Sequence, residues 1–111
     1  MAIEINTMKK IISTDQAPSA IGPYSQAILS GETLYCSGQI AIDPKSGKLV
    51  KGTINQETTQ VMRNISAILK AADMDFSNVI KCTIFLKDMN KYAEINDVYS
   101  SFFNIEPPAR E

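Results

Sequence analysis

The chain offers few side chains for chemistry, because its 111 residues include no histidine. This absence excludes Ser/His/Asp and Cys/His catalysis and removes the commonest metal ligand. The most distinctive charged side chain is Arg110, which follows the consecutive prolines Pro107 and Pro108. Two prolines set a stiff, extended backbone, and a guanidinium on such a support can bind a carboxylate through two parallel hydrogen bonds. A solvated arginine near the C-terminus is the alternative interpretation.

Tyr24 is the second candidate, since Pro23 directly precedes it. Proline fixes its own φ and pushes Gly22 toward extended geometry, so the tyrosine ring is held rigidly at the start of a strand. An aromatic hydroxyl in this place suits packing against a ligand as well as it suits capping of the core. The sequence leaves these two roles equally open.

Ser37 and Gly38 form the third candidate, within an apolar segment of alternating register. A glycine inside a strand weakens it, unless something must approach the backbone closely. A small ligand lying against the bare main chain beside the Ser37 hydroxyl satisfies this condition. A closely packed neighbouring strand or helix satisfies it too, and from the strand alone this structural alternative is favoured.

Asn96 is the fourth candidate, because it falls inside the apolar stripe of a predicted helix rather than on its solvent side. At about 100° per residue, it lies close to Tyr92 and Phe103 on the helix surface. An amide in such a stripe must find hydrogen-bond partners. Those partners are either structural backbone groups, which is the commoner case, or part of a ligand site.

The elements that position these residues follow from hydrophobic periodicity and turn signals. Alternating apolar residues predict strands, and apolar residues at helical spacing behind a Thr53–Gln56 capping box predict a helix. A Ser-Gly-Glu turn at 30–32 joins two of the strands into a hairpin. The predicted order is a strand at 8–13, strands at 24–29 and 33–42, a helix at 56–72, a strand at 79–87 and a helix that begins at 88–90 and reaches 103.

This order is typical of an α+β fold in which two helices pack on one face of a mixed, mostly antiparallel sheet. Residues 1–7 are expected to be a flexible leader, and residues 8–111 a single domain. The first helix is expected to turn a solvated face away from the core, formed by Glu57, Gln60, Asn64 and Lys70.

Composition limits the classes of function further. Hydrophobic residues make up 44% of the chain, charged residues 21%, and the net charge is −1, as in an ordinary globular domain. No basic block beyond Lys9–Lys10 supports nucleic-acid binding, and no apolar run is long enough to span a membrane. Cys36 and Cys82 lie in predicted strands, which predicts two buried, reduced thiols in a cytoplasmic protein; a disulfide between them is disfavoured.

Several short motifs occur together along the chain. They are AIGPYSQA at 20–27, CSGQI at 36–40, FLKDM at 85–89, NDVY at 96–99 with FF at 102–103, and PAR at 108–110. Each motif alone is weak, but the set is specific. In this set the sequence resembles the RidA family (reactive intermediate deaminase A, also called YjgF-like), from about residue 8 to the last residue.

The resemblance implies a chorismate-mutase-like α+β fold and a homotrimer whose sheets build a central barrel, with three sites between subunits. It implies hydrolysis of 2-imino acids, such as 2-iminopropanoate and 2-iminobutanoate, to 2-oxo acids and ammonia, without a cofactor or metal. Matched by position, Arg110 resembles the catalytic residue that binds the substrate carboxylate. Tyr24 resembles the aromatic wall of the cleft, Ser37 and Gly38 its floor, and Asn96 a polar residue that lines it.

The end of the sequence departs from the family pattern. Family members continue past the arginine through a final pair of strands, which carry a glutamate that helps to position the attacking water. This sequence ends at Glu111, which is not assigned that role, and the natural protein is expected to be longer. The leading hypothesis is a 2-imino acid deaminase. The alternatives are a trimeric module that binds small 2-oxo or imino carboxylates without turnover and, disfavoured by the charge, a protein- or RNA-binding role.

Overall fold

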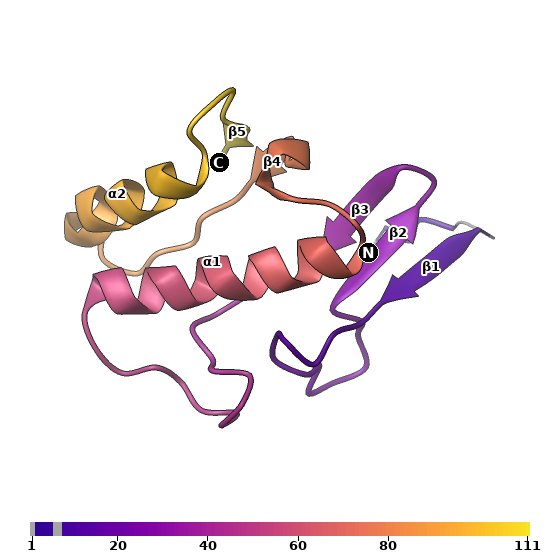
Figure 1. Cartoon of the computed structure of the whole chain (residues 1–111), viewed down its shortest axis with the longest axis horizontal. Coiled ribbons are helices and arrows are strands. Elements are labelled where there is room, and N and C mark those ends of the chain that lie inside the picture. Colours follow the sequence, from indigo (N-terminus) through magenta and orange to yellow (C-terminus); the bar gives the residue numbers. More distant parts are fainter. Residues whose placement is uncertain (1, 6–7) are drawn as a thin grey trace.

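Helix α1 (Ile54–Ala71) is the longest element, and the rest of the chain packs around it (Figure 1). The figure shows a computed structural model, which describes residues 2–5 and 8–111. The predicted capping box is confirmed, because the Thr53 hydroxyl accepts from the Gln56 amide at 3.1 Å and the Gln56 side chain accepts from the Thr53 amide at 2.9 Å. These two bonds satisfy donors that the first turn of a helix leaves free.

The N-terminal half of the chain forms a three-stranded antiparallel sheet in the order β1-β2-β3, namely β1 (Lys9–Ile12), β2 (Ala27–Ser30) and β3 (Thr33–Cys36). The hairpin between β2 and β3 is confirmed, with Ala27 opposite Cys36 and Ser30 opposite Thr33. Its turn contains Gly31 at φ +60°, a conformation that glycine adopts without strain. The register therefore follows from the turn and the apolar alternation together.

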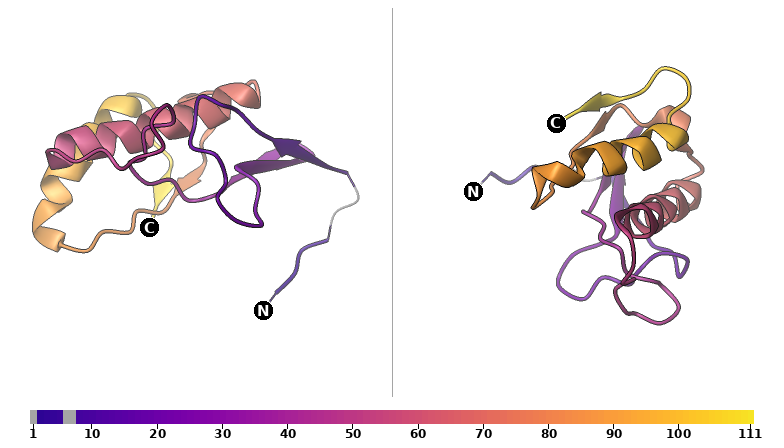
Figure 2. Two further views of the ribbon diagram at one scale, coloured as in Figure 1. Left: turned by 90° about the horizontal axis from the view of Figure 1, so that it is seen from below. Right: turned by 90° about the vertical axis from the view of Figure 1, so that its left-hand side faces the viewer.

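The C-terminal half places two strands beside a second helix. In order, its elements are the short 3₁₀ helix η1 (Phe76–Asn78), β4 (Lys81–Cys82), the 3₁₀ helix η2 (Met89–Lys91), α2 (Tyr92–Phe102) and β5 (Ala109–Arg110). Strands β4 and β5 pair in parallel, with Cys82 opposite Arg110. Helix α2 packs on α1 through Tyr99 and Met62, and the right view of Figure 2, which looks along α1, shows α2 next to it. The predicted α+β class with two helices is confirmed.

All four predicted strands are shorter than expected; the strand expected from residue 24 begins only at Ala27, so Tyr24 precedes it. The segment 33–42 is a strand only as far as Cys36, and the segment 79–87 only at Lys81–Cys82. Within the described residues, β3 forms a ladder with β2 alone and β4 with β5 alone. Beyond these ladders the two segments make isolated contacts, such as the bridge of Ile42 to Leu49 and the bond from the Ile84 amide to the Glu111 carbonyl. Phe85, in the unpaired part, is 93% exposed. The sheet is thus two sheets, one antiparallel and one parallel.

Two apolar clusters meet at α1. Ile68 packs with Ile12 and Ala27 of the three-stranded sheet, whereas Met62, nearer the start of the helix, packs with Tyr99 and Phe103 at the end of α2. Half-buried Cys82, Ile84, Val79 and Phe76 complete the second cluster. Helix α1 therefore packs against both the β-hairpin and α2 and holds them in place relative to each other.

Other expectations have mixed outcomes. Residues 2–5 are exposed and carry no helix or strand, while positions 1, 6 and 7 of the expected leader lie outside the described residues. Cys36 is exposed and only Cys82 is half-buried, so the prediction of two buried thiols is wrong for Cys36; both thiols are free. In the described part of the chain, no helix is long and apolar enough to cross a membrane. That part also contains no group of three acidic or cysteine side chains placed to hold a metal ion.

Candidate functional site

The Arg110 side chain lies against α2 and is held at both terminal nitrogens. Its Nη1 donates to Oδ1 of Asn96 at 2.8 Å, and its Nη2 donates to the hydroxyl of Tyr92. The partners are four residues apart on the helix, so they lie on one face in successive turns. Two acceptors on two nitrogens fix the plane of the guanidinium as well as its place.

Aromatic rings complete the support for Arg110. Its Cζ lies 5.0 Å from the ring centroid of Tyr99 and 5.5 Å from that of Tyr92. At these distances the face of each ring attracts the cation. Arg110 itself remains exposed to solvent. We refer to Arg110, Tyr92, Asn96 and Tyr99 as the arginine cluster.

Strand β5 presents Arg110 toward α2. The Glu111 amide donates to the Cys82 carbonyl at 2.9 Å, and the Ala109 amide donates to the Ile80 carbonyl at 3.1 Å. Because side chains alternate along a strand, Glu111 points away from Arg110, and its carboxylate pairs with the Lys81 ammonium at 3.0 Å. The contacts of Arg110 within the described residues are therefore to neutral acceptors and aromatic rings, which leave its positive charge uncompensated.

The Tyr99 hydroxyl lies beneath this cluster. Tyr99 is 7% exposed, and its oxygen is buried without a hydrogen-bond partner of normal geometry in the described part of the molecule. Burial is the main cause that raises the pKa of the hydroxyl; the neighbouring Cys82 thiol adds to the shift and the charge of Arg110 opposes it. Tyr99 thus supports the guanidinium with its ring and stays protonated at neutral pH.

Tyr24, Ser37 and Gly38 form a second group, which we call the hairpin cluster. The Ser37 hydroxyl donates to the Ser25 carbonyl at 2.6 Å, and the Ser37 amide donates to the Gln26 carbonyl at 3.0 Å. These bonds tie the end of β3 to the segment that leads into β2. The predicted hydroxyl therefore lies next to the tyrosine segment, as the two motifs suggested.

The Cβ position of Gly38 is open within the part of the chain that the structure describes. A Cβ atom built on it meets no atom within 4 Å beyond its own neighbours. Among the described residues, no strand or helix packs closely against the Cβ position of Gly38, so the structural alternative raised by the sequence has no support within one chain. The backbone at Gly38 is open to whatever approaches it from outside.

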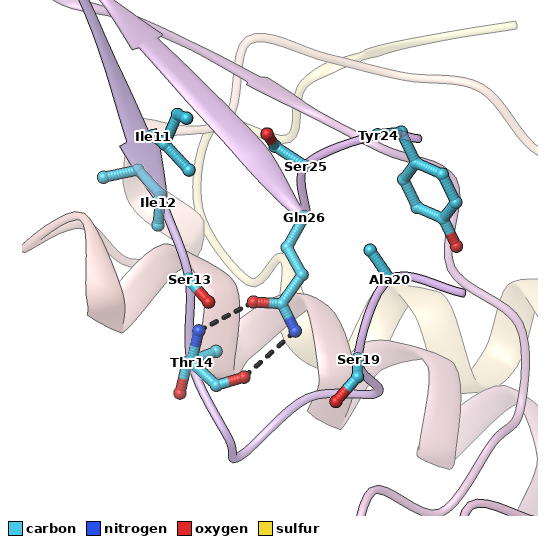
Figure 3. Close-up of a pocket in the computed structure, with 9 residues that line it drawn as sticks. All are labelled: Ile11, Ile12, Ser13, Thr14, Ser19, Ala20, Tyr24, Ser25 and Gln26. Carbon is cyan, nitrogen blue, oxygen red and sulfur yellow. Dashed lines mark hydrogen bonds between the residues drawn. The ribbon is translucent and has the colours of Figure 1, made fainter. Parts of the chain in front are cut away.

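Tyr24 lines a cavity of about 220 Å³, together with residues 11–14, 19–20 and 25–26 (Figure 3). Gln26 closes the floor of this cavity and is 5% exposed. Its side-chain oxygen accepts from the Thr14 amide at 2.7 Å, and its nitrogen donates to the carbonyls of Thr14 at 3.0 Å and Pro18 at 2.8 Å. Gln26 thereby fastens the loop that carries the cavity wall to the end of β1.

Asn64 supports the hairpin cluster from the other side. It is fully buried in α1, and its side-chain nitrogen donates to the carbonyls of Ile40 at 3.2 Å and Ile42 at 2.9 Å. Gln60, one turn earlier, donates to the Asn64 oxygen at 2.9 Å. The expectation that Asn64 belongs to a solvated face is wrong, because its side chain is buried and its amide donates to two carbonyls of the segment that follows Gly38.

The predicted site residues are thus brought together in two groups. The Asn96 amide has Arg110 as its partner, and Ser37 is bonded to Ser25, the residue that follows Tyr24. No hydrogen bond or ion pair among the described residues links the arginine cluster to the hairpin cluster. The sequence also missed two members of the arginine cluster, Tyr92 and Tyr99. Their spacing from Asn96, four residues before and three after, was the available signal.

Comparison with known proteins identifies the fold and motifs together. A family model described as Endoribonuclease L-PSP matches residues 14–111, which include every residue of both clusters. The chain belongs to the RidA (YjgF-like) family. RidA-family membership accounts for the joint occurrence of the glycine, tyrosine and arginine motifs in one order.

The relatives agree closely over most of the chain. The 2-iminobutanoate/2-iminopropanoate deaminase of Bos taurus is 52% identical over 103 residues, which cover 93% of this chain and 75% of that protein. A crystal structure from Thermotoga maritima has a TM-score of 0.92 and 46% identity, over 94% of this chain and 82% of that one. E. coli TdcF, solved with bound serine, has a TM-score of 0.87 and 37% identity, over 92% and 82%.

Proposed function

We propose that this protein hydrolyses 2-imino acids, such as 2-iminopropanoate and 2-iminobutanoate, to 2-oxo acids and ammonia. In this reaction water adds to the C2 carbon of the imine, and the resulting carbinolamine loses ammonia as its hydroxyl becomes the 2-oxo group. The observation that carries the proposal is the Arg110 guanidinium, oriented at both nitrogens and free of any acidic partner in the described residues. The deaminase named among the relatives supports it.

Arg110 is the residue that binds the substrate carboxylate. A guanidinium has five N–H donors, so the two bonds to α2 leave enough donors for both oxygens of a carboxylate. The neutral partners Asn96 and Tyr92 orient the group without competing for its charge. TdcF was solved with serine, a small molecule that carries the same carboxylate.

The imine supplies much of its own reactivity, since its C2 carbon is electrophilic and becomes more so when the nitrogen is protonated. The protein needs only to hold the carboxylate, exclude bulk solvent and direct a water molecule. No cofactor or metal enters this mechanism. Assistance of this kind accelerates the reaction by about a hundredfold to a thousandfold, which corresponds to about 3–4 kcal/mol.

The hairpin cluster supplies the walls of the site. In this proposal Tyr24 is the aromatic wall, and Ser37 with the open backbone of Gly38 is the floor. We propose further that, in a homotrimer, the arginine cluster of one subunit faces the hairpin cluster of the next. A cyclic trimer repeats this heterologous contact three times and gives three sites. The two free thiols suit a cytoplasmic location.

The test measures ammonia release from an imine that an amino-acid oxidase generates in the cuvette. The wild-type chain is compared with the Arg110→Ala and Arg63→Ala variants. Arg63 is the only other arginine in the sequence, and it lies exposed on α1. We expect the wild type and Arg63→Ala to accelerate release equally, and Arg110→Ala to lose at least about nine-tenths of the acceleration, because a charge-assisted bidentate contact disappears.

Two other outcomes contradict the proposal. If the wild type binds a 2-oxo acid but does not accelerate ammonia release, the chain is a binding module without turnover. If Arg110→Ala accelerates release as well as the wild type, the carboxylate is bound elsewhere.

A further inference from the structure

The orientation of Arg110 involves the Tyr92 hydroxyl, for which Arg110 is the one hydrogen-bond partner among the described residues. Tyr92 is 39% exposed, so its ring is not a core residue, and its oxygen accepts from Nη2 of Arg110. Tyr99, by contrast, offers Arg110 only its ring, since its hydroxyl lies on the buried side near Cys82. The two tyrosines of the arginine cluster therefore contribute different atoms.

A single acceptor does not fix a guanidinium. With Asn96 alone bonded to Nη1, the guanidinium can still tilt about that bond. A free arginine side chain has about 2 kcal/mol of rotamer entropy, which opposes its being held in one orientation. The Tyr92 hydroxyl on Nη2 removes that freedom. Both acceptors lie on the α2 side, so the remaining N–H donors face away from the helix, where a ligand approaches.

The hydroxyl also has the right charge for this task. An acidic side chain in the same place would hold Arg110 more strongly, but it would compete with an anionic ligand for the guanidinium. A neutral oxygen orients the donors and leaves the full charge for the ligand.

We infer that Tyr92 is a positioning residue that holds the Arg110 guanidinium in the orientation that binds a carboxylate. The inference rests on the proposed function, and it concerns the hydroxyl rather than the ring. It predicts a loss confined to ligands that carry a carboxylate.

The test is the Tyr92→Phe variant, with Tyr35→Phe as the matched control. Tyr35 is 55% exposed on β3, outside the arginine cluster, so its replacement removes a hydroxyl of no consequence for Arg110. Dissociation constants are measured for 2-oxobutanoate and for its neutral amide. We expect Tyr92→Phe to weaken binding of the acid about tenfold, as loss of a hydrogen bond to a charged group does, and to leave binding of the amide unchanged.

Kinetics and NMR separate positioning from a merely structural role. In the deamination assay KM should rise about tenfold in Tyr92→Phe while kcat changes less than about twofold, because the lost interaction serves binding. In ¹⁵N spectra the Arg110 side chain should show faster rotation of its Nη groups in Tyr92→Phe than in Tyr35→Phe.

The outcomes are distinguishable. Equal affinity of the wild type and Tyr92→Phe for 2-oxobutanoate overturns this inference and leaves the proposed function standing. Equal losses for the acid and the amide also overturn it, since they indicate a damaged fold. Absence of 2-oxobutanoate binding by the wild type overturns the proposed function, and this inference with it.

Discussion

The arginine cluster and the hairpin cluster differ in how much of each is fixed within one chain. The Arg110 guanidinium is held by two hydrogen bonds and two rings, all from α2. In the hairpin cluster, Ser37 is tied by backbone carbonyls, while Gly38 meets nothing and Tyr24 is 51% exposed. The charged group is pre-oriented and the surface that would enclose a ligand is open.

The proposed function accounts for this difference between the two clusters. A cation that selects a carboxylate needs fixed donors, and fixing them in advance lowers the entropy cost of binding. The walls of a site exclude water by fitting closely around the ligand, and a surface of a second subunit can complete such an enclosure. Around the hairpin cluster the exposed apolar side chains Ile21 (89%) and Ile40 (59%) are well suited to such a surface.

The sharpest test of this comparison mixes two inactive variants, one for each cluster. Gly38→Val fills the open backbone position without an intrachain clash, and Arg110→Ala removes the guanidinium. If the clusters of neighbouring subunits form one site, each variant alone is inactive, and co-assembly from equal amounts restores about a quarter of the wild-type activity. Activity is measured by ammonia release, and the mass of the assembly by sedimentation.

A matched control for this mixture pairs Arg110→Ala with Arg110→Gln. Both variants damage the same cluster, so their mixture should regain no activity. A mixture of Gly38→Val and Arg110→Ala that also stays inactive, although its mass is that of a trimer, would show that the two clusters serve separate purposes.

The second test removes the support of the hairpin cluster alone. Asn64→Ala removes a buried amide that donates to the carbonyls of Ile40 and Ile42, of which that of Ile40 also accepts from the Ile42 amide, and we expect a loss of about 1–3 kcal/mol in the free energy of unfolding. Denaturant unfolding measures the loss, with Asn55→Ala, an exposed position in the first turn of α1, as the control. Equal stability of the two variants would show that water replaces the Asn64 amide at no cost.

The third and smallest effect concerns Tyr99, which supports Arg110 through its ring only. Replacement of the orphaned hydroxyl in Tyr99→Phe should raise the free energy of unfolding at pH 7 by up to about 1 kcal/mol, because a buried group without a partner is removed. Binding of 2-oxobutanoate should stay within about twofold of the wild type, unlike in Tyr92→Phe.

The stability of the Tyr99→Phe variant at alkaline pH provides a second test. The pKa of the folded Tyr99 hydroxyl is raised by burial, so the folded state keeps its proton where the unfolded chain, with a pKa of about 10, releases it. The stabilisation is complete below about pH 10 and is lost as the pH rises further, because the unfolded state then binds fewer protons. Tyr99→Phe should lose stability less steeply above pH 10 than Tyr35→Phe. If the free energy of unfolding fell equally steeply with pH in both variants, the raised pKa of the Tyr99 hydroxyl would be contradicted.

The sequence predicted the local elements well and the pairing of strands less well. Three predictions that depend on short-range rules are confirmed: the capping box of α1, the hairpin at Gly31, and the need of the Asn96 amide for a hydrogen-bond partner. The strands observed in the segments 33–42 and 79–87 are shorter than expected. Alternation of apolar and polar residues indicates that one face of an extended segment can be buried, but it does not indicate whether another strand lies beside it.

In the candidate site too, the sequence predicted single residues better than the contacts between them. Arg110 and Asn96 were each singled out for their residue type, and the structure adds the contact between them. Tyr92 and Asn64 were assigned to an apolar stripe and a solvated face, because periodicity averages over a helix and does not reveal which carbonyl or guanidinium lies opposite. Residues that act through one specific contact need the tertiary structure before they can be found.

Helix α1 is the only element represented in both apolar clusters of the described chain. No strand pairing joins the two sheets, so Met62 and Ile68, less than two turns apart, connect what are otherwise two separate folding units. Opening of the β4–β5 half therefore need not disturb the three-stranded sheet, whereas unwinding of the middle of α1 releases both halves at once. The stability of this one helix sets the cooperativity of unfolding for the whole molecule.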